Sequence, residues 1–147
     1  MTISIGGGNL IFCASNNYMD INEGCAGKGA QEFRKQWPQI LYEIRYRICS
    51  NAEIYVMTVY NPYKGNDPNY SKTNHFIQQI NGAIQNPYYK SIYNYKVVDV
   101  SSSFRGQWYD GTWKVCAWTN FCSDIRDPHP NDCGHQEIYR LHRFITD

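Results

Sequence analysis

The chain has 147 residues, of which 42% are apolar and 18% are charged, and its formal net charge is +1. This length suffices for one domain with a sizeable core, and the composition excludes an intrinsically disordered chain. The small net charge and the lack of a basic run exclude a nucleic-acid-binding protein, and no apolar run reaches the roughly 20 residues of a membrane span.

The first residues have the character of a strand. The β-branched run TISI at 2–5 ends at three glycines, which predicts a strand entering a turn. No basic region precedes an apolar stretch here, so the segment is not a signal peptide. Because a domain seldom begins inside a strand, we expect that an N-terminal part of the parent domain is missing.

Two long helices are predicted before residue 87. Helical spacing of apolar residues predicts the first over 28–48, interrupted at Pro38, where a kink or a second segment is expected. The second should be capped by Ser71 and stopped by Asn86 and Pro87. The two apolar faces carry Phe33, Trp37, Ile40, Leu41, Ile44 and Ile48 in the first helix, and Phe76, Ile77, Ile80 and Ile84 in the second.

Two further strands and a last helix complete the pattern. The apolar run IYVMTVY at 54–60 is typical of a strand buried on both faces, and YKVVDV at 95–100 predicts another strand. A helix is predicted over 134–145. Alternating strands and helices predict a right-handed parallel α/β sheet, whose ligands bind beyond the C-terminal strand ends. Those ends are 6–9, 61–63 and 101–104, and the loop 127–131 can reach the same edge.

Six cysteines in a loop-rich chain indicate an oxidising compartment and hence a secreted protein. Six cysteines allow fifteen pairings, so the sequence does not fix the connectivity. We predict a disulfide between Cys13 and Cys25, and a second local pair is expected between Cys116 and Cys122. The alternatives are unpaired thiols in a reduced cytoplasm and, for Cys49, a position in the core.

The stretch DPHPNDCGH at 127–135 carries the strongest chemical signal. A carboxylate close to a histidine can hold one imidazole nitrogen and stabilise the imidazolium that forms when the ring accepts a proton. Prolines on both sides of His129 restrict its backbone. These residues predict a catalytic pair of Asp127 and His129. The alternative is a proline-rich turn that starts the last helix, with Asp132 favoured by the helix dipole.

A metal site is a second alternative for this region. None of the usual ligand spacings is present, so we expect neither a metal ion nor another cofactor. His75 and His142 fall on helical patterns and are expected to be surface or packing residues. The potential ligands that lie close together in the sequence are Cys122, His129, Cys133 and His135.

Four segments, in chain order, resemble the blocks of the SGNH/GDSL esterase and lipase family. TISIGGGNL resembles the block after the family's third strand, IYVMTVYNPY and VVDVSSSF resemble its fourth and fifth strands, and DPHPNDCGH resembles its C-terminal Asp/His block. The resemblance implies a three-layer flavodoxin-like parallel sheet with helices on both faces. The resemblance further implies that residues 1–147 form a partial hydrolase domain, which lacks the first strand and the nucleophile segment. The implied reaction is hydrolysis of a small-molecule ester, either a lipid or an acylated sugar.

The resemblance also implies roles for individual residues. His129 would be the general base and Asp127 its orienting carboxylate, with Asp124 as a fallback because one residue, rather than the usual two, separates the pair. Asn9 and Gly7 would form the oxyanion hole, although an ungapped match places the family's asparagine on Gly8. His135 would lie outside the triad.

The family's Gly-Asp-Ser block has no counterpart in this chain. The serines at 101–103 follow the fifth strand, not the first, and are not assigned as nucleophiles. We therefore expect the chain alone to be inactive and the missing N-terminal segment to be its partner. The alternative function is a non-catalytic remnant that binds acyl or glycan groups through an aromatic surface, which the 16% content of aromatic residues favours.

Overall fold

The computed structural model describes residues 1–48 and 51–146, so Cys49 lies outside the described residues. In this part of the chain, three strands form a parallel sheet with the order β1-β4-β5. The central strand β4 pairs with β1 on one side and with β5 on the other, which confirms the predicted parallel α/β arrangement. The strands are β1 (Thr2–Ile3), β4 (Ile54–Met57) and β5 (Tyr95–Val98).

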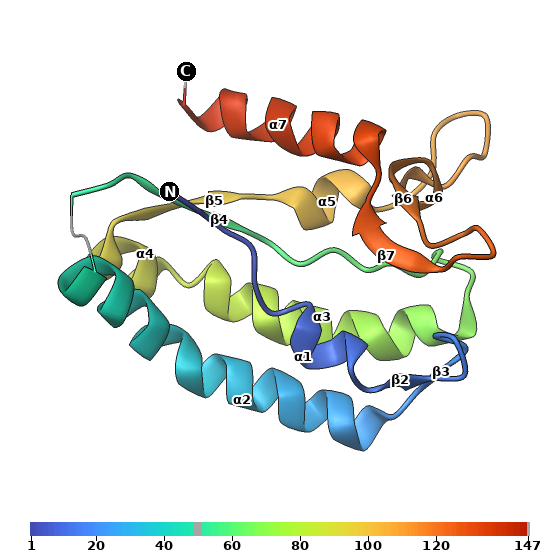
Figure 1. Ribbon diagram of the computed structural model, residues 1–147, viewed down its shortest axis with the longest axis horizontal. Helices are drawn as coiled ribbons and strands as arrows, with labels where there is room; N and C mark the ends of the chain where they lie inside the picture. Colours follow the sequence, from blue (N-terminus) through green and yellow to red (C-terminus); the bar gives the residue numbers. More distant parts are fainter. Residues whose placement is uncertain (49–50, 147) are drawn as a thin grey trace.

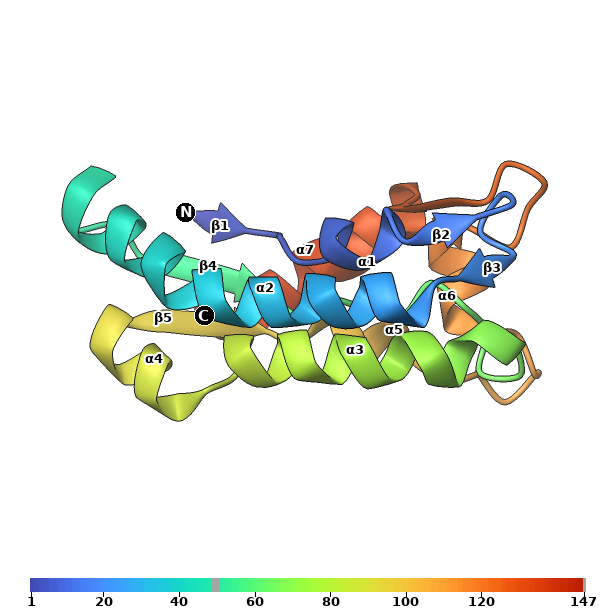
Figure 2. The same cartoon turned by 90° about the horizontal axis from the view of Figure 1, so that it is seen from below.

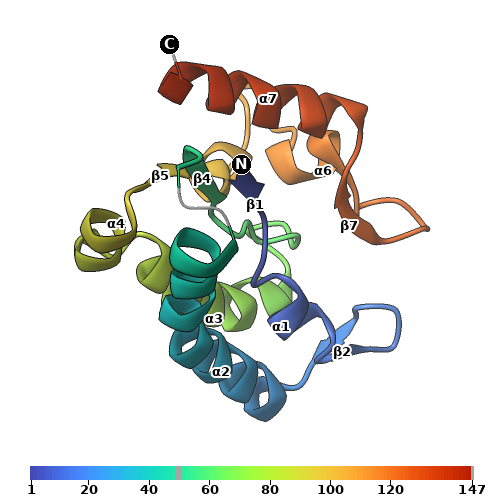
Figure 3. The same cartoon turned by 60° about the vertical axis from the view of Figure 1, so that its left-hand side comes forward.

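Helices lie on both sides of this sheet. Helix α2 (Glu23–Tyr42) continues into the π-helical segment η1 (Glu43–Ile48) and runs beside α3 (Pro68–Ile84) along the length of the molecule (Figure 1, Figure 2). Helix α7 (Asp132–Thr146) lies across the opposite side (Figure 3). The short elements are α1 (Gly8–Ile11), α4 (Pro87–Tyr93), α5 (Val100–Phe104), α6 (Lys114–Trp118) and the antiparallel pairs β2 (Ala14–Ser15) with β3 (Asp20–Ile21) and β6 (Thr119–Asn120) with β7 (Asp127–Pro130).

The main core fills the space between the sheet and the pair α2 and α3. Trp37 and Leu41 of α2 and Ile80 of α3 are buried in one cluster with Val56 of β4, as the helical spacing predicts. Ile48, which we expected on the same face, is 69% exposed. The i→i+5 hydrogen bonds of the π-helical segment change the angle between successive side chains, so the last turn leaves the apolar face.

A smaller core lies under α7. Ile138 of α7 packs against Val98 of β5 and Phe104 of α5, and Leu141 and Ile145 are partly buried beside them. These three residues, at helical spacing, form the inner face of the helix.

The beginning of α3 differs from the expectation. The Asp67 side chain, rather than Ser71, caps the helix by accepting a hydrogen bond of 2.8 Å from the Asn69 N–H. Pro68 occupies the first helical position, where its missing N–H and fixed φ are no disadvantage. An Asp-Pro pair thus starts the helix one turn earlier than the serine would have done. Helix α2 also continues through Pro38 instead of restarting there.

A buried amide holds the chain where it leaves β4. The Asn81 side chain, 8% exposed, accepts a hydrogen bond of 2.7 Å from the Val59 N–H and donates one of 2.8 Å to the Val59 carbonyl. It therefore satisfies both backbone groups of Val59, as a neighbouring strand would. Gly6 approaches the same place with φ +102°, and a Cβ there would lie 2.9 Å from the Ile80 Cγ2. The turn after β1 thus requires glycine.

Both local disulfides expected from the sequence are present. The Cα atoms of Cys13 and Cys25 are 5.6 Å apart, and those of Cys116 and Cys122 are 5.2 Å apart. Cys133 is exposed and bonds to none of the described cysteines. Two disulfides in a chain of this size indicate an oxidising environment. Among the described residues, no helix combines the length and the apolar character needed to cross a bilayer.

Replacing Cys13 and Cys25 together with serine should lower the free energy of unfolding by about 3 kcal/mol, because the bond restricts the unfolded chain. Urea unfolding of the oxidised protein measures the change. The matched control replaces Cys116 and Cys122, whose sequence separation of 6, against 12, predicts a smaller loss. An unchanged unfolding midpoint in the first variant would contradict the assignment of this crosslink.

The Asn81→Ala variant should lose about 3 kcal/mol of stability, since it leaves both backbone groups of Val59 buried without a partner. The matched control is Asn74→Ala on the same helix, because the Asn74 side chain makes no hydrogen bond to any described residue. Chemical unfolding of both variants compares the two amides. Equal losses would show that the Val59 contacts contribute nothing specific.

Candidate functional site

One large groove lies beside the turn after β1. Its volume is about 510 Å³, and its walls come from the turn between β1 and α1, the end of β4, α3 and β7. Apolar side chains dominate the walls, among them Ile5, Leu10 and Val59, and His129 lies among the lining residues. An open apolar groove with few polar groups is the usual form of a binding site for an apolar ligand.

Asp127 and His129 are in direct contact within β7. The His129 Nδ1 lies 2.6 Å from the Asp127 Oδ1, and the His129 backbone N–H donates to the same oxygen at 3.0 Å. An ionised carboxylate can only accept, so the contact protonates Nδ1 and leaves Nε2 as the nitrogen that can accept a proton. The structure therefore brings together the two residues that the motif predicted as base and orienting group.

The surroundings keep the Asp127 carboxylate ionised. The hydrogen bond from the His129 N–H, followed by that from its imidazole, holds the pKa of the Asp127 carboxyl below its usual value. The Asp127 side chain is 40% exposed and that of His129 is 83% exposed, so water and small molecules reach both. The hydrogen bond thus fixes the relative position of the two side chains, and both remain accessible to solvent.

A buried phenol supports the backbone between the two residues. The Tyr60 hydroxyl donates a hydrogen bond to the Pro128 carbonyl. Burial, with a smaller contribution from the Asp127 charge, raises the pKa of Tyr60 well above its usual value. The phenol therefore stays protonated and keeps donating. No motif in the sequence assigns a role to Tyr60, although it lies at the C-terminal end of the predicted strand 54–60, where site residues are expected.

Asn131 joins β7 to the rest of the fold. Its backbone N–H donates to the Trp118 carbonyl at 2.9 Å and its side-chain amide to the Ala117 carbonyl at 3.0 Å. Its side-chain oxygen accepts from the Gly134 N–H at 3.0 Å and thereby caps α7. The segment therefore also starts the last helix, as the structural alternative predicted, with Asp132 in the first turn but Asn131 as the cap.

The residues expected at the oxyanion hole are separated. Gly7 lines the groove together with Gly8 and His129. Asn9 instead donates its side-chain amide to the Gly29 carbonyl of α2 at 3.2 Å and is not part of the groove lining. The backbone N–H groups of Gly7 and Gly8 donate to no described residue. Backbone amides, rather than the Asn9 side chain, are therefore the available donors at this edge.

The serines of the 101–103 run lie away from the dyad. Ser101 and Ser102 line a separate pocket, and the Ser103 hydroxyl donates to the Glu137 carboxylate. Within the described chain, no hydroxyl lies within hydrogen-bonding distance of the His129 Nε2. The dyad therefore has a base and an orienting group but no partner hydroxyl among these residues.

Asp124 is exposed and forms no ion pair with His129, and His135 is an exposed residue of α7. His142 packs near the Tyr55 ring, and His75 contacts the Phe76 ring edge-on. In the described ranges, no group of three or more His, Cys, Asp or Glu residues is placed to hold a metal ion.

The carboxyl of Asp127 should titrate below the value of about 3.9 that is usual for aspartate. Because its pKa is lowered in the folded state, its contribution to stability is present above pH 3.9 and is lost as the pH falls through the folded pKa. Carboxyl-detected NMR measures it. In His129→Ala the pKa should rise yet stay below 3.9, since the backbone hydrogen bond remains. His135→Ala should leave it unchanged; a wild-type value above 3.9 would contradict the geometry.

The chain was compared with known families, curated proteins and solved structures. No protein-family model, no curated protein and no solved structure matches it. The contact between Asp127 and His129, together with the groove beside it, therefore carries the functional conclusion.

Proposed function

We propose that this chain is part of an ester hydrolase of the SGNH/GDSL type. The observation that carries the proposal is the Asp127 and His129 pair, joined at 2.6 Å and placed at the rim of an apolar groove of about 510 Å³. A base held by a carboxylate, beside a surface suited to an acyl chain, is the arrangement that ester hydrolysis through an acyl-enzyme requires.

The sheet supports the same proposal. In the described chain, β1 pairs only with β4, so the backbone groups on its other side are available to another strand. The resemblance places the family's first strand, which ends at the nucleophilic serine, next to this one. A parallel strand added there would end beside Gly7 and His129 and would extend the sheet of a three-layer flavodoxin-like domain. The required serine would come from outside the described residues.

The chemistry follows from the positions of the donors and the base. The serine hydroxyl attacks the ester carbonyl while the His129 Nε2 takes its proton, and the Asp127 carboxylate stabilises the imidazolium. The N–H groups of Gly7 and Gly8 would donate to the oxyanion. The imidazolium then returns the proton to the leaving alcohol, and water repeats the sequence to release the acid. The groove would hold the acyl chain, and the disulfides suit secretion.

The alternative function is a non-catalytic module that binds glycans or acyl groups. A chain of tyrosine rings in η1, α4 and the end of α2 favours it, because successive ring centroids lie 5.2, 6.2, 6.4 and 5.8 Å apart. Tyr42, Tyr46 and Tyr88 of this chain of rings are exposed and present both an apolar face and a hydroxyl, as sugar-binding surfaces do, while Tyr89 and Tyr93 are partly buried against the core. In ring order they are Tyr42, Tyr46, Tyr93, Tyr89 and Tyr88.

The chain alone should show no hydrolysis of p-nitrophenyl butyrate above that of His129→Ala, because no described hydroxyl reaches Nε2. Fusing a strand that ends in Gly-Asp-Ser ahead of β1 should create an activity that His129→Ala abolishes and Asp127→Asn reduces at least about a hundredfold. His135→Ala is the matched control and should retain the activity. The rate is measured from the absorbance of the released p-nitrophenol.

Two outcomes would count against the proposal. Turnover by the unmodified chain that depends on His129 would reveal a nucleophile within the described residues. It would overturn the proposal that the serine comes from outside them. A well-folded fusion protein without activity, combined with glycan binding that is lost when Tyr46 and Tyr88 are replaced, would favour the non-catalytic alternative.

A further inference from the structure

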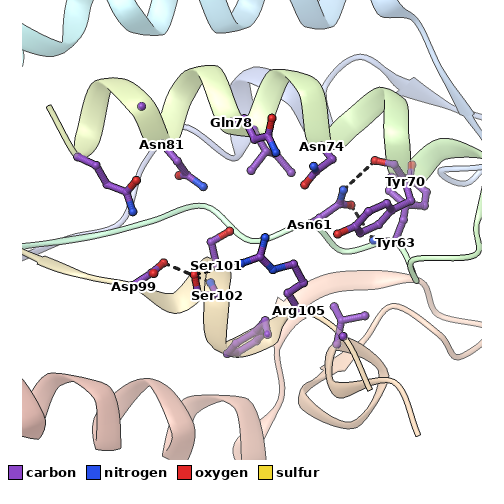
Figure 4. A pocket seen from close by; sticks show the side chains of 16 residues that line it. Asn61, Tyr63, Tyr70, Asn74, Gln78, Asn81, Asp99, Ser101, Ser102 and Arg105 are labelled. Atoms are coloured by element: carbon purple, nitrogen blue, oxygen red, sulfur yellow. Dashed lines mark hydrogen bonds between the residues drawn. The ribbon is translucent and has the colours of Figure 1, made fainter. Parts of the chain in front are cut away.

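A second, smaller pocket lies on the other side of the chain that leaves β4. Its volume is about 220 Å³, and α3, α5 and the residues after β4 form its walls (Figure 4). Tyr63 and Ile77 contribute to this pocket and to the groove, so the two cavities are neighbours. His129 and the glycines after β1 are not among its lining residues, which separates it from the proposed ester site.

Amide side chains of α3 line one wall of this pocket. Asn74, Gln78 and Gln85 share a helical face, and Figure 4 shows Asn74 extending from the helix towards the opposite wall. None of the three side chains makes a hydrogen bond to a described residue. The amides of Asn61 and Asn81 are already used, the first by the Tyr70 carbonyl and the second by Val59. Three amides therefore have free donors and acceptors.

The opposite wall carries the cationic side chain of Arg105. The Arg105 guanidinium points into the space near Ser101 and Asn61 (Figure 4). The guanidinium donates one long hydrogen bond of 3.5 Å to the Ser102 hydroxyl, and it forms no salt bridge with any described residue. The Asp99 carboxylate on the same wall is engaged by the Thr58 hydroxyl and the Ser102 N–H. The donors of Arg105 are thus available to a ligand.

A glycine keeps the pocket open. Gly82 lies on α3 between the free amides, and a Cβ built on it would meet no atom within 4 Å. Its backbone is helical, so glycine is not needed here for conformation and is less favourable than alanine would be in a helix. The missing side chain leaves room at the pocket wall.

We propose that this pocket binds a small polyhydroxylated carboxylate, of the size and chemistry of a hexuronate. Its volume is below the roughly 300–1,000 Å³ that is usual for larger ligands, which limits the occupant to about one sugar ring. The Arg105 fork matches a carboxylate in two parallel hydrogen bonds. The free amides and the Ser101 hydroxyl pair with ring hydroxyls, whereas an apolar occupant would leave them unsatisfied. The proposal does not depend on ester hydrolysis.

The test is a titration of the ¹⁵N-labelled chain, followed by NMR, with D-glucuronate as the probe. We expect saturable shifts at residues 74–85 and 101–106 with a millimolar dissociation constant, and at least about tenfold weaker binding of D-glucose and of propionate. Glucose lacks the carboxylate, and propionate lacks the ring hydroxyls. Equal binding of glucose and glucuronate, or no saturable shift with glucuronate, would overturn the proposal.

Variants assign the binding to the pocket. Arg105→Gln should weaken glucuronate binding about tenfold or more, because a charge-assisted pair is lost, and Arg126→Gln, a substitution outside the pocket, should have no effect. Gly82→Leu should abolish binding by filling the pocket, whereas Gly82→Ala adds one methyl group to the same helix and should retain it. Unchanged amide spectra away from the pocket verify the fold. Binding that survives both Arg105→Gln and Gly82→Leu would overturn the proposal.

Discussion

The side chain of Asn81 decides where the chain runs after the central strand. By satisfying both backbone groups of Val59, it supplies from helix α3 the hydrogen bonds that another strand would make. Val59 lies in the groove wall and Asn61 in the wall of the smaller pocket, so one buried amide divides the region into two cavities. The Asn81 oxygen and nitrogen both have partners in this arrangement. The amide therefore stabilises one course of the backbone after β4, because any other course would leave it buried without these hydrogen bonds.

The two cavities differ in chemistry although they share a boundary. The groove is lined mainly by apolar side chains and meets a carboxylate and an imidazole at its rim, while the pocket is lined by amides, hydroxyls and one guanidinium. Tyr63 belongs to both, and its hydroxyl is held by the Tyr18 carbonyl at 2.8 Å. Tyr63 therefore has an apolar surface on one side and a polar surface on the other, which suits a ligand with an apolar and a polar part. Because aromatic residues line both cavities, the aromatic content of the chain alone does not distinguish a lipid ligand from a sugar ligand.

Local patterns in the sequence were sufficient for the parts of the structure that depend on neighbours in the chain. The contact between Asp127 and His129 spans two residues, the disulfides close short loops, and the spacing of Trp37 and Leu41 reports one helical face. Two local predictions, Ser71 as the cap of α3 and Ile48 on the apolar face, were wrong. Other differences involve partners that are distant in sequence. Asn9 was expected to face the groove, but the close approach of α1 to α2 gives its amide a partner at Gly29. Likewise, nothing in the sequence next to Arg105 indicates that α3, more than twenty residues earlier, places three free amides opposite it.

The position of β1 at one side of the sheet has a consequence for local motion. It is held by two residue pairs, Thr2 with Tyr55 and Ile3 with Val56, whereas β4 is held on both sides. Opening of β1 therefore breaks few hydrogen bonds and uncovers Ile3, while release of β4 disrupts pairing on both of its sides and the main core. Amide hydrogens of β4 should accordingly exchange with solvent only through global unfolding, and those around β1 through small, frequent openings. The glycine turn beside the dyad follows β1 directly, so such openings would change the shape of the groove while the rest of the fold stays intact.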